Sequence, residues 1–264
     1  MILDVLELTF AVLMLCVIIL YAMLFSCVWA WAQNNLEANL DFFDLISTTA
    51  IEWGGIISLI LLHFYPARVY HEAPPLKEGR DSSPLIPIIF VPSLHTGASI
   101  FNFVIWRLKK NNWYSLWPFQ WKFFLKDPEL LEDQLFNAIS EIIEKTNARR
   151  FRIVNFGSSR PLVMRVLNRK DLRAYCDKWI AISSPISLSN FFQFTSSSRL
   201  KKVYATVESD NKNPDLQIIG ENDFFSYPIS HFGEGKKIVI PKIGHFSCLL
   251  HSTTIQSTLK ELSQ

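Results

Sequence analysis

Three short segments of the chain each carry a side chain suited to acyl-transfer chemistry, in the order serine, aspartate, histidine. They span residues 157–161 (GSSRP), 220–223 (GEND) and 244–246 (GHF). A serine hydroxyl is a weak nucleophile until a histidine removes its proton, and a carboxylate then orients the imidazole ring. These segments therefore supply the candidate nucleophiles Ser159 and Ser158, the candidate orienting acid Asp223 and the candidate base His245.

Each of these segments directly follows a short apolar run of the kind that forms a buried strand. Such runs alternate with amphipathic, helix-like patterns, and this alternation favours a mostly parallel sheet with helices on both faces. The expected strands are Pro87–Val91, Trp113–Leu116, Phe151–Phe156, Trp179–Ser183, Leu216–Ile219 and Lys237–Ile240. The expected helices are Ile100–Lys110, Glu129–Thr146, one that begins over Pro161–Leu167, and Ile255–Leu262.

Five stretches of this region resemble segments of α/β-hydrolases of the bacterial triacylglycerol lipase and esterase kind. They are IIFVPSLHTGASIFNFVIWRLKKNNW, RIVNFGSSRPLVMR, WIAISSPISLSN, IIGENDFFSYPIS and KIGHFSCLLHS. A sixth, IEWGGIISLILLHFYP, is similar to the hydrophobic stretch that precedes the hydrolase domain in relatives with N-terminal membrane segments. The resemblance covers the chain from about Glu52 to its C-terminus.

This resemblance implies an α/β-hydrolase fold and a membrane-anchored serine hydrolase that cleaves an acyl or lipid ester through a Ser-His-Asp triad. It also implies that two backbone N–H groups stabilise the tetrahedral anion. These belong to Leu94 and to the residue after the nucleophile, which is Arg160 if the nucleophile is Ser159. No cofactor is implied.

The serine turn departs from the family pattern Gly-x-Ser-x-Gly. Ser159 as nucleophile retains Gly157 and replaces the second glycine by Pro161, which suits the first turn of a helix. Ser158 as nucleophile loses both glycines, although the LVMR run downstream favours it. We expect Ser159, with a positive φ and its Oγ within hydrogen-bond reach of His245.

Further departures leave a second interpretation open. Pro92-Ser93 stands where the family has His-Gly, and Ser183-Ser184-Pro185-Ile186 stands where it has Gly-Thr-Pro-His. With the altered serine turn, they are compatible with a catalytically degenerate member of the fold that acts in binding or scaffolding.

The N-terminal region predicts a membrane anchor. Leu8–Trp31 contains no charged residue and is long enough for the roughly 20 residues that span a bilayer, with Trp29 and Trp31 at one end. The stretch Leu45–Tyr65, which contains Glu52, is either a second span or an interfacial helix packed on the domain. We expect an anchor over residues 1–66, a linker over 67–85 and a hydrolase domain over 86–264.

Charge patterning adds an orientation and excludes some partners. Basic residues follow the second apolar stretch, so the positive-inside rule places the domain in the cytoplasm, at what we expect to be a bacterial inner membrane. The expected partners are the lipid bilayer and a small acyl-ester or lipid substrate. A net charge of +2 that is dispersed along the chain does not favour nucleic acid. The sequence does not indicate an oligomeric state.

Neither a phosphate-binding glycine loop nor a metal-binding cysteine or histidine spacing is present. The four cysteines are Cys16, Cys27, Cys176 and Cys248. We expect buried free thiols, with a Cys176–Cys248 disulfide as the alternative.

Overall fold

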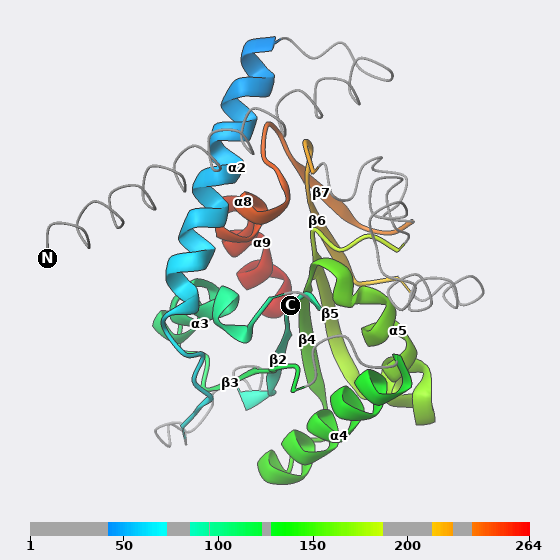
Figure 1. Cartoon of the computed structure of the whole chain (residues 1–264). Helices are drawn as coiled ribbons and strands as arrows, with labels where there is room; N and C mark the ends of the chain where they lie inside the picture. Colours follow the sequence, from blue (N-terminus) through cyan, green and yellow to red (C-terminus); the bar gives the residue numbers. More distant parts are fainter. Residues whose placement is uncertain (1–41, 73–84, 95, 123–127, 187–212, 224–233) are drawn as a thin grey trace, which may run out of the picture.

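A seven-stranded sheet forms the centre of the protein in the computed structural model, which describes residues 42–72, 85–94, 96–122, 128–186, 213–223 and 234–264 (Figure 1). The strand order is β1-β3-β2-β4-β5-β6-β7, and every neighbouring pair is parallel except β1 with β3. The strands are β1 Tyr70–His71, β2 Ile88–Val91, β3 Ser115–Pro118, β4 Phe151–Phe156, β5 Cys176–Ile182, β6 Leu216–Gly220 and β7 Lys237–Ile240. Strands β2 and β4 are buried along their whole length because helices cover both of their faces.

The helices lie in two layers, one on each face of the sheet (Figure 1). One layer contains α2 Phe42–His63, α3 Asn102–Lys110, α8 His245–Leu250 and α9 Ser252–Leu262. The other contains α4 Pro128–Thr146 and α5 Arg160–Asn168. Three short 3-10 turns, η2 Ala98–Phe101, η3 Gly157–Ser159 and η4 Arg169–Ala174, connect these elements. The two cores meet the same strands from opposite sides, so the sheet is the rigid frame on which the loops are placed.

Most predicted elements are present. Strands β4 and β7 have the predicted bounds, β5 begins three residues earlier than predicted, and β3 lies two residues later. Strand β1 was not predicted and falls within the expected linker, where its two residues pair with β3. Helix α8 was also not predicted, because a helix of six residues is too short to establish a hydrophobic period.

The segment 45–65 forms most of helix α2, which packs against α8 with Glu52 6% exposed in the contact. Of the two expectations for this segment, the structure corresponds to a helix packed on the domain. No helix among the described residues is long and apolar enough to cross a membrane, so a second span gains no support. The expected span Leu8–Trp31 lies outside the described residues.

Both cysteines of the described region, Cys176 and Cys248, are free and buried, so the expectation of buried thiols is confirmed for this pair and the alternative disulfide between them is not formed. Burial raises the pKa of each thiol to about 12. Neither is therefore a thiolate near neutral pH, and neither is a candidate nucleophile.

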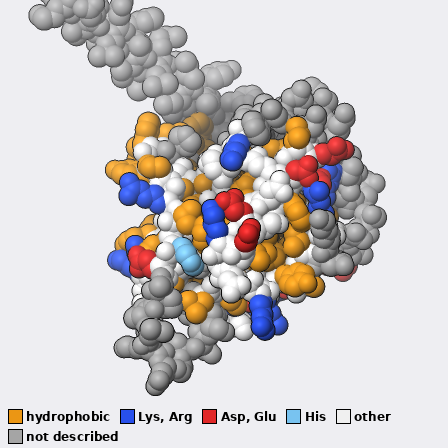
Figure 2. Space-filling model, turned by 90° about the horizontal axis from the view of Figure 1, so that it is seen from below, with side chains coloured by type: hydrophobic (Ala, Val, Ile, Leu, Met, Phe, Trp, Pro, Cys, Tyr) orange, Lys and Arg blue, Asp and Glu red, His pale blue; other side chains and the backbone are white. Residues whose placement is uncertain are grey.

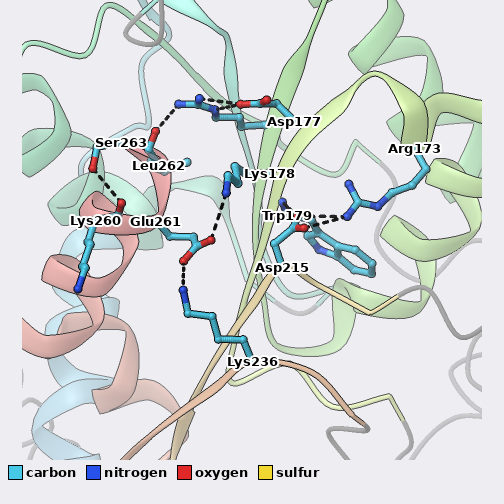
Figure 3. A network of polar contacts seen from close by, with 11 residues as sticks. Arg173, Asp177, Lys178, Trp179, Asp215, Lys236, Lys260, Glu261, Leu262 and Ser263 are labelled. Carbon is cyan, nitrogen blue, oxygen red and sulfur yellow. Dashed lines mark hydrogen bonds and ion pairs between the residues drawn. The ribbon is translucent and has the colours of Figure 1, made fainter.

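A polar network ties the amino-terminal edge of the sheet to the end of helix α9 (Figure 3). Glu261 of α9 pairs with Lys178 at 3.3 Å and with Lys236 at 2.5 Å. Asp215, just before β6, accepts from the backbone N–H of Trp179 at 2.7 Å and from Arg173 at 3.1 Å.

On the face viewed from below, acidic and basic side chains are interspersed among apolar ones (Figure 2).

Candidate active site

The loops that follow β2, β4, β6 and β7 meet at the carboxyl-terminal edge of the sheet. Parallel strands bring their carboxyl ends to one edge, which is where open α/β sheets place their sites. Backbone hydrogen bonds join the last two loops directly, from Glu221 N–H to Ile240 O at 2.9 Å and from Asn222 N–H to Ile243 O at 3.0 Å. The predicted acid and the predicted base are therefore held against each other by backbone.

Asp223 and His245 form a close pair. Nδ1 of His245 lies 2.9 Å from each carboxylate oxygen of Asp223, and the two residues are 7% and 2% exposed in that order. Burial lowers the pKa of His245, but the Asp223 carboxylate, through its charge and hydrogen bond, and the charge of Glu52 raise that pKa more, so it lies above its ordinary value. With Nδ1 directed at Asp223, Nε2 is the nitrogen that remains for proton transfer.

Gly157, and neither serine, occupies the sharp turn between β4 and α5. Its φ is +61°, a conformation that favours glycine. A Cβ atom built on Gly157 would lie 3.4 Å from Nε2 of His245 and 2.9 Å from the Cβ of Ser93. The residue that faces the base in this structure is thus a glycine, which has no hydroxyl to activate.

Ser159 lies behind the turn. It is fully buried, its φ is −81°, and its Oγ is 2.9 Å from the carbonyl oxygen of Phe156 and 3.3 Å from that of Val91. Asn155 donates to the same Oγ at 3.3 Å and to Ser184 Oγ at 2.7 Å. The structure does not bring Ser159 to His245, and its hydroxyl instead fastens the turn to β4 and β2.

Ser158 lies in turn η3 after β4, and its side chain is directed at the loop after β2. Its Oγ accepts from the backbone N–H of Leu94 at 3.1 Å and lies 2.8 Å from the Oγ of Ser93. The backbone N–H of Ser158 approaches Ser93 Oγ at 3.4 Å. The bond between the two hydroxyls uses one of their protons, so one hydroxyl proton remains that can be donated to a ligand oxygen.

The two expected oxyanion donors, Leu94 and Arg160, differ in where the structure places them. The N–H of Leu94 is directed at Ser158 Oγ, beside the turn after β4. Because Gly157 takes the turn, the following N–H belongs to Ser158 and not to Arg160. Arg160 begins α5, and its buried guanidinium donates to the Ser184 carbonyl at 3.0 Å and to Gln217 Oε1 at 2.8 Å. Its side chain therefore supports the sheet behind the site.

Gly157 and Ser93 are the site residues that sequence reasoning missed. A signal for the first was available, because β4 was correctly predicted to end at Phe156 and Gly157 is the first residue after it. The family pattern drew attention to the serines instead. For Ser93 only the replacement of a family glycine indicated a new side chain in the loop.

An apolar pocket opens beside the acid–base pair, between helix α2 and the loop after β2. Its volume is about 250 Å³. Its lining is contributed by Ile56, Leu59 and Ile60 of α2, by Thr96, Gly97 and Ile100, and by Phe246. His245 does not line the pocket itself, but the ring of Phe246, which does, lies 5.0 Å from the imidazole ring of His245, measured between centroids. Among the described residues, no cluster of three His, Cys, Asp or Glu side chains is arranged to hold a metal ion.

Comparisons with known proteins support the fold. No family profile matches the sequence, and no curated protein matches it. Lipase B of Aspergillus fumigatus superposes with a TM-score of 0.58 at 13% identity, covering 90% of this chain and 75% of the lipase. The mature Bacillus licheniformis lipase BlEst2 superposes with a TM-score of 0.54 at 15% identity, covering 71% of this chain and 96% of the lipase.

One of these lipases is fungal and the other bacterial, so the comparisons do not indicate a source. Both are hydrolases, and both share with this chain a mostly parallel sheet covered by helices. The α/β-hydrolase part of the predicted fold class is thereby confirmed, whereas the transmembrane helix expected before it is not found among the described residues.

Proposed function

We propose that this protein is a carboxylic-ester hydrolase in which His245, oriented by Asp223, acts as general base on a water molecule. The observation that carries the proposal is the buried Asp223–His245 pair, whose Nε2 is directed at the turn of Gly157. A general base of this kind contributes about 10²- to 10⁴-fold to a hydrolytic rate. Because a glycine stands in the turn, no acyl-enzyme intermediate is part of this mechanism.

In the proposed reaction, Nε2 of His245 takes a proton from water while the water oxygen attacks the ester carbonyl carbon. The carbonyl oxygen becomes the anion, and Leu94 N–H, Ser158 N–H and the spare proton of the Ser93–Ser158 hydroxyl pair are the nearby donors. Collapse of the tetrahedral anion breaks the bond to the alcohol oxygen, which receives the proton from His245. The products are a carboxylic acid and an alcohol.

The apolar pocket favours a substrate with an acyl chain. Its walls are mostly aliphatic and aromatic, and the Phe246 ring in its lining contacts the imidazole ring of His245. Burial of a chain there contributes roughly 25 cal/mol for each Å² of apolar surface removed from water. We therefore propose an acyl or lipid ester, with its chain against α2 and its carbonyl at His245.

A second candidate function is ligand binding without hydrolysis. It is favoured by the hydroxyls of Ser158 and Ser93, which accept from the two N–H groups that would stabilise the anion. An ester carbonyl must displace these contacts before it can be polarised. In this alternative the protein binds an acyl compound in the same pocket and acts through that binding.

One experiment distinguishes the two candidates. The purified full chain is incubated with p-nitrophenyl esters of different chain length, and separately with a fluorophosphonate probe. Hydrolysis with no initial burst and no labelling is the expected result. A folded wild type that binds a fluorescent fatty acid but does not hydrolyse any ester would establish the second candidate. Labelling that is lost in Ser158→Ala would replace both by a covalent serine mechanism.

Restoring a hydroxyl at the turn provides the matched gain-of-function control. In the double variant Gly157→Ser with Ser93→Gly, the new side chain faces Nε2 of His245, and removal of the Ser93 side chain relieves the 2.9 Å approach to its Cβ. We expect this variant to become labelled by the fluorophosphonate, whereas Ser93→Gly alone stays unlabelled. Labelling must also disappear when His245→Gln is added.

We further propose that the protein works at a bilayer surface, with its basic side toward anionic lipid headgroups on the cytoplasmic side. The exposed side chains of α2 that the structure describes are uncharged and mostly apolar, and helix α3, whose Asn102 donates to Tyr65 O just after α2, carries exposed Trp106 and several basic residues. The exposed apolar side chains of α2 include Phe43, Ile46, Ile51, Ile57, Ile60 and Leu61, and the exposed basic residues nearby are Arg68, Arg107, Lys109 and Lys110. A helix with this distribution suits the membrane interface.

The membrane proposal is tested with the full chain in vesicles that contain brominated anionic lipids. A fluorophore on Ile57→Cys, in a background without other cysteines, should be quenched by the lipid. The same fluorophore on Leu130→Cys of α4, an equally exposed apolar position on the other face of the sheet, should not be quenched. Equal fluorescence at the two positions would rule out α2 as a lipid-facing helix.

A further inference from the structure

Helix α2 carries two polar side chains on the face that it turns toward the domain. Thr48 and Glu52 are one helical turn apart, and their exposed fractions are 0% and 6%. Both bind partners outside their own helix, and these partners belong to the loops that carry the acid–base pair. A helix that was only covering the sheet would place apolar side chains at these positions.

Glu52 caps the helix that begins with His245. One carboxylate oxygen accepts from the backbone N–H of Phe246 at 2.7 Å. The other accepts from the backbone N–H of Ser247 at 3.0 Å and from its hydroxyl at 2.6 Å. The first N–H groups of a helix have no partner within the helix, and a carboxylate near them is further stabilised by the helix dipole. The start of α8, and with it His245, is thus fixed by a residue nearly 200 positions earlier in the chain.

Thr48 makes the corresponding contact with the acid loop. Asn222 donates from its side-chain amide to Thr48 Oγ1 at 2.9 Å, and both side chains are buried. Asn222 directly precedes Asp223. One face of α2 therefore holds the loop of the acid through Thr48 and the loop of the base through Glu52.

The approach of the two helices leaves little freedom for α2 to shift. A Cβ atom built on Gly55 would lie 2.8 Å from the backbone nitrogen and 2.9 Å from the Cα of Ser247. Real Cβ atoms do not come this close to backbone, so the contact requires glycine at this position. A side chain at position 55 would consequently push α8 away from α2.

We infer that α2 is a positioning element for the acid–base pair, with Glu52 and Thr48 as its positioning residues. The inference rests on the proposed function of that pair. One face of α2 holds the loops of His245 and Asp223. A contact on the opposite, outer face that shifts the helix would therefore shift these loops as well.

The electrostatics of Glu52 support a role that packing alone would not require. Burial raises the pKa of its carboxyl, and its three hydrogen bonds act in the opposite direction. Its negative charge in turn contributes to raising the pKa of His245. Among the described residues, Asp223 from the loop after β6 and Glu52 from α2 raise the pKa of His245, and each can be removed separately.

The test uses the full chain labelled with ¹³C-histidine and follows the titration of His245 by NMR, in parallel with the pH profile of ester hydrolysis. Glu52→Gln removes the charge at nearly constant shape. We expect the titration midpoint of His245 and the acidic limb of the rate to move to lower pH together, and kcat to fall with KM little changed. Glu52→Asp, which keeps the charge, should recover most of the midpoint.

The control variant is Ser58→Ala on the same helix, because Ser58 donates only within α2, to Gly54 O at 2.8 Å. It should leave both the titration and the rate unchanged. A folded Glu52→Gln protein with the wild-type midpoint would overturn the inference. If Glu52→Gln does not fold, Thr48→Val takes its place, and unchanged His245 resonances and kcat in that variant would overturn it equally. A wild type without esterase activity contradicts the proposed function only, since the NMR titration does not depend on hydrolysis.

Discussion

The two edges of the central sheet use polar side chains in opposite ways. At the amino-terminal edge, Asp177 and Glu261 each bind basic side chains from neighbouring elements, and the charges there are matched (Figure 3). At the carboxyl-terminal edge, the same strands end in serine hydroxyls, a glycine with positive φ and one buried Asp–His pair. The comparison indicates that one edge stabilises the fold, whereas the other holds reactive groups in place at some cost in stability.

The largest expected effect is a loss of activity without a loss of stability, caused by a substitution at the carboxyl-terminal edge. His245→Gln keeps a side chain that can donate to Asp223 but cannot act as a base near neutral pH. We expect the rate of ester hydrolysis to fall about 10²- to 10⁴-fold, while the thermal unfolding midpoint changes little. The measurement is initial rate with a p-nitrophenyl ester together with calorimetry. A variant that retains the wild-type rate would show that His245 is not the base.

The second prediction makes the converse change at the amino-terminal edge. Asp177 pairs with Arg152 at 2.6 Å, and the arginine side chain is 3% exposed, so Asp177→Asn leaves a buried cation without its counter-charge. We expect the free energy of unfolding to fall by about 2 to 3 kcal/mol and kcat/KM to stay at its wild-type value. Urea unfolding provides the measurement.

The control for that variant is Asp133→Asn, which breaks the pair of Asp133 with Arg169 on the surface, where the two side chains are 51% and 42% exposed. Exposed pairs contribute little to stability because water screens them. Equal losses of unfolding free energy in the two variants would mean that the buried pair of Arg152 stabilises the protein no more than an exposed pair does.

The sequence was sufficient for six of the seven strands of the sheet, because each of these is a mostly apolar run between polar turns. Strand β4, for example, was predicted with its observed bounds, and all six of its residues are buried. The structure also brings the predicted residues Asp223 and His245 together, because their loops follow consecutive strands. These features depend on local pattern and on the geometry of parallel strands.

The serine turn and helix α2 depend on contacts that the sequence does not display. The backbone conformation at Gly157 determines which residue faces His245. The sequence does not show this conformation, and the neighbouring serines of a family-like motif were predicted instead. Glu52 was interpreted as a charge within or near a membrane, whereas its partners are the backbone N–H groups of Phe246 and Ser247. Nothing in the local sequence indicates a contact over such a separation along the chain.

The smallest expected effect is a displacement of the acidic limb of the pH–rate profile. Only the neutral imidazole accepts a proton, and the pKa of His245 is raised because Asp223 and Glu52 together outweigh the effect of burial. The rate should therefore increase with pH through a midpoint above the ordinary histidine value of 6.5, which lowers the rate at neutral pH relative to an unshifted base. By the same linkage, the stability contributed by protonated His245 is fully present below pH 6.5 and is lost as pH rises through the folded pKa.

This displacement connects the two edges in a single measurement. Asp177→Asn should leave the limb unchanged, because neither Asp177 nor its partners contribute to the pKa of His245. Asp223→Asn should move the limb to lower pH, since Asp223 contributes more than Glu52 to raising the pKa of His245. A limb that moves in Asp177→Asn and stays in place in Asp223→Asn would mean that the titrating group lies at the amino-terminal edge, and the assignment of stability to one edge and chemistry to the other would then be reversed.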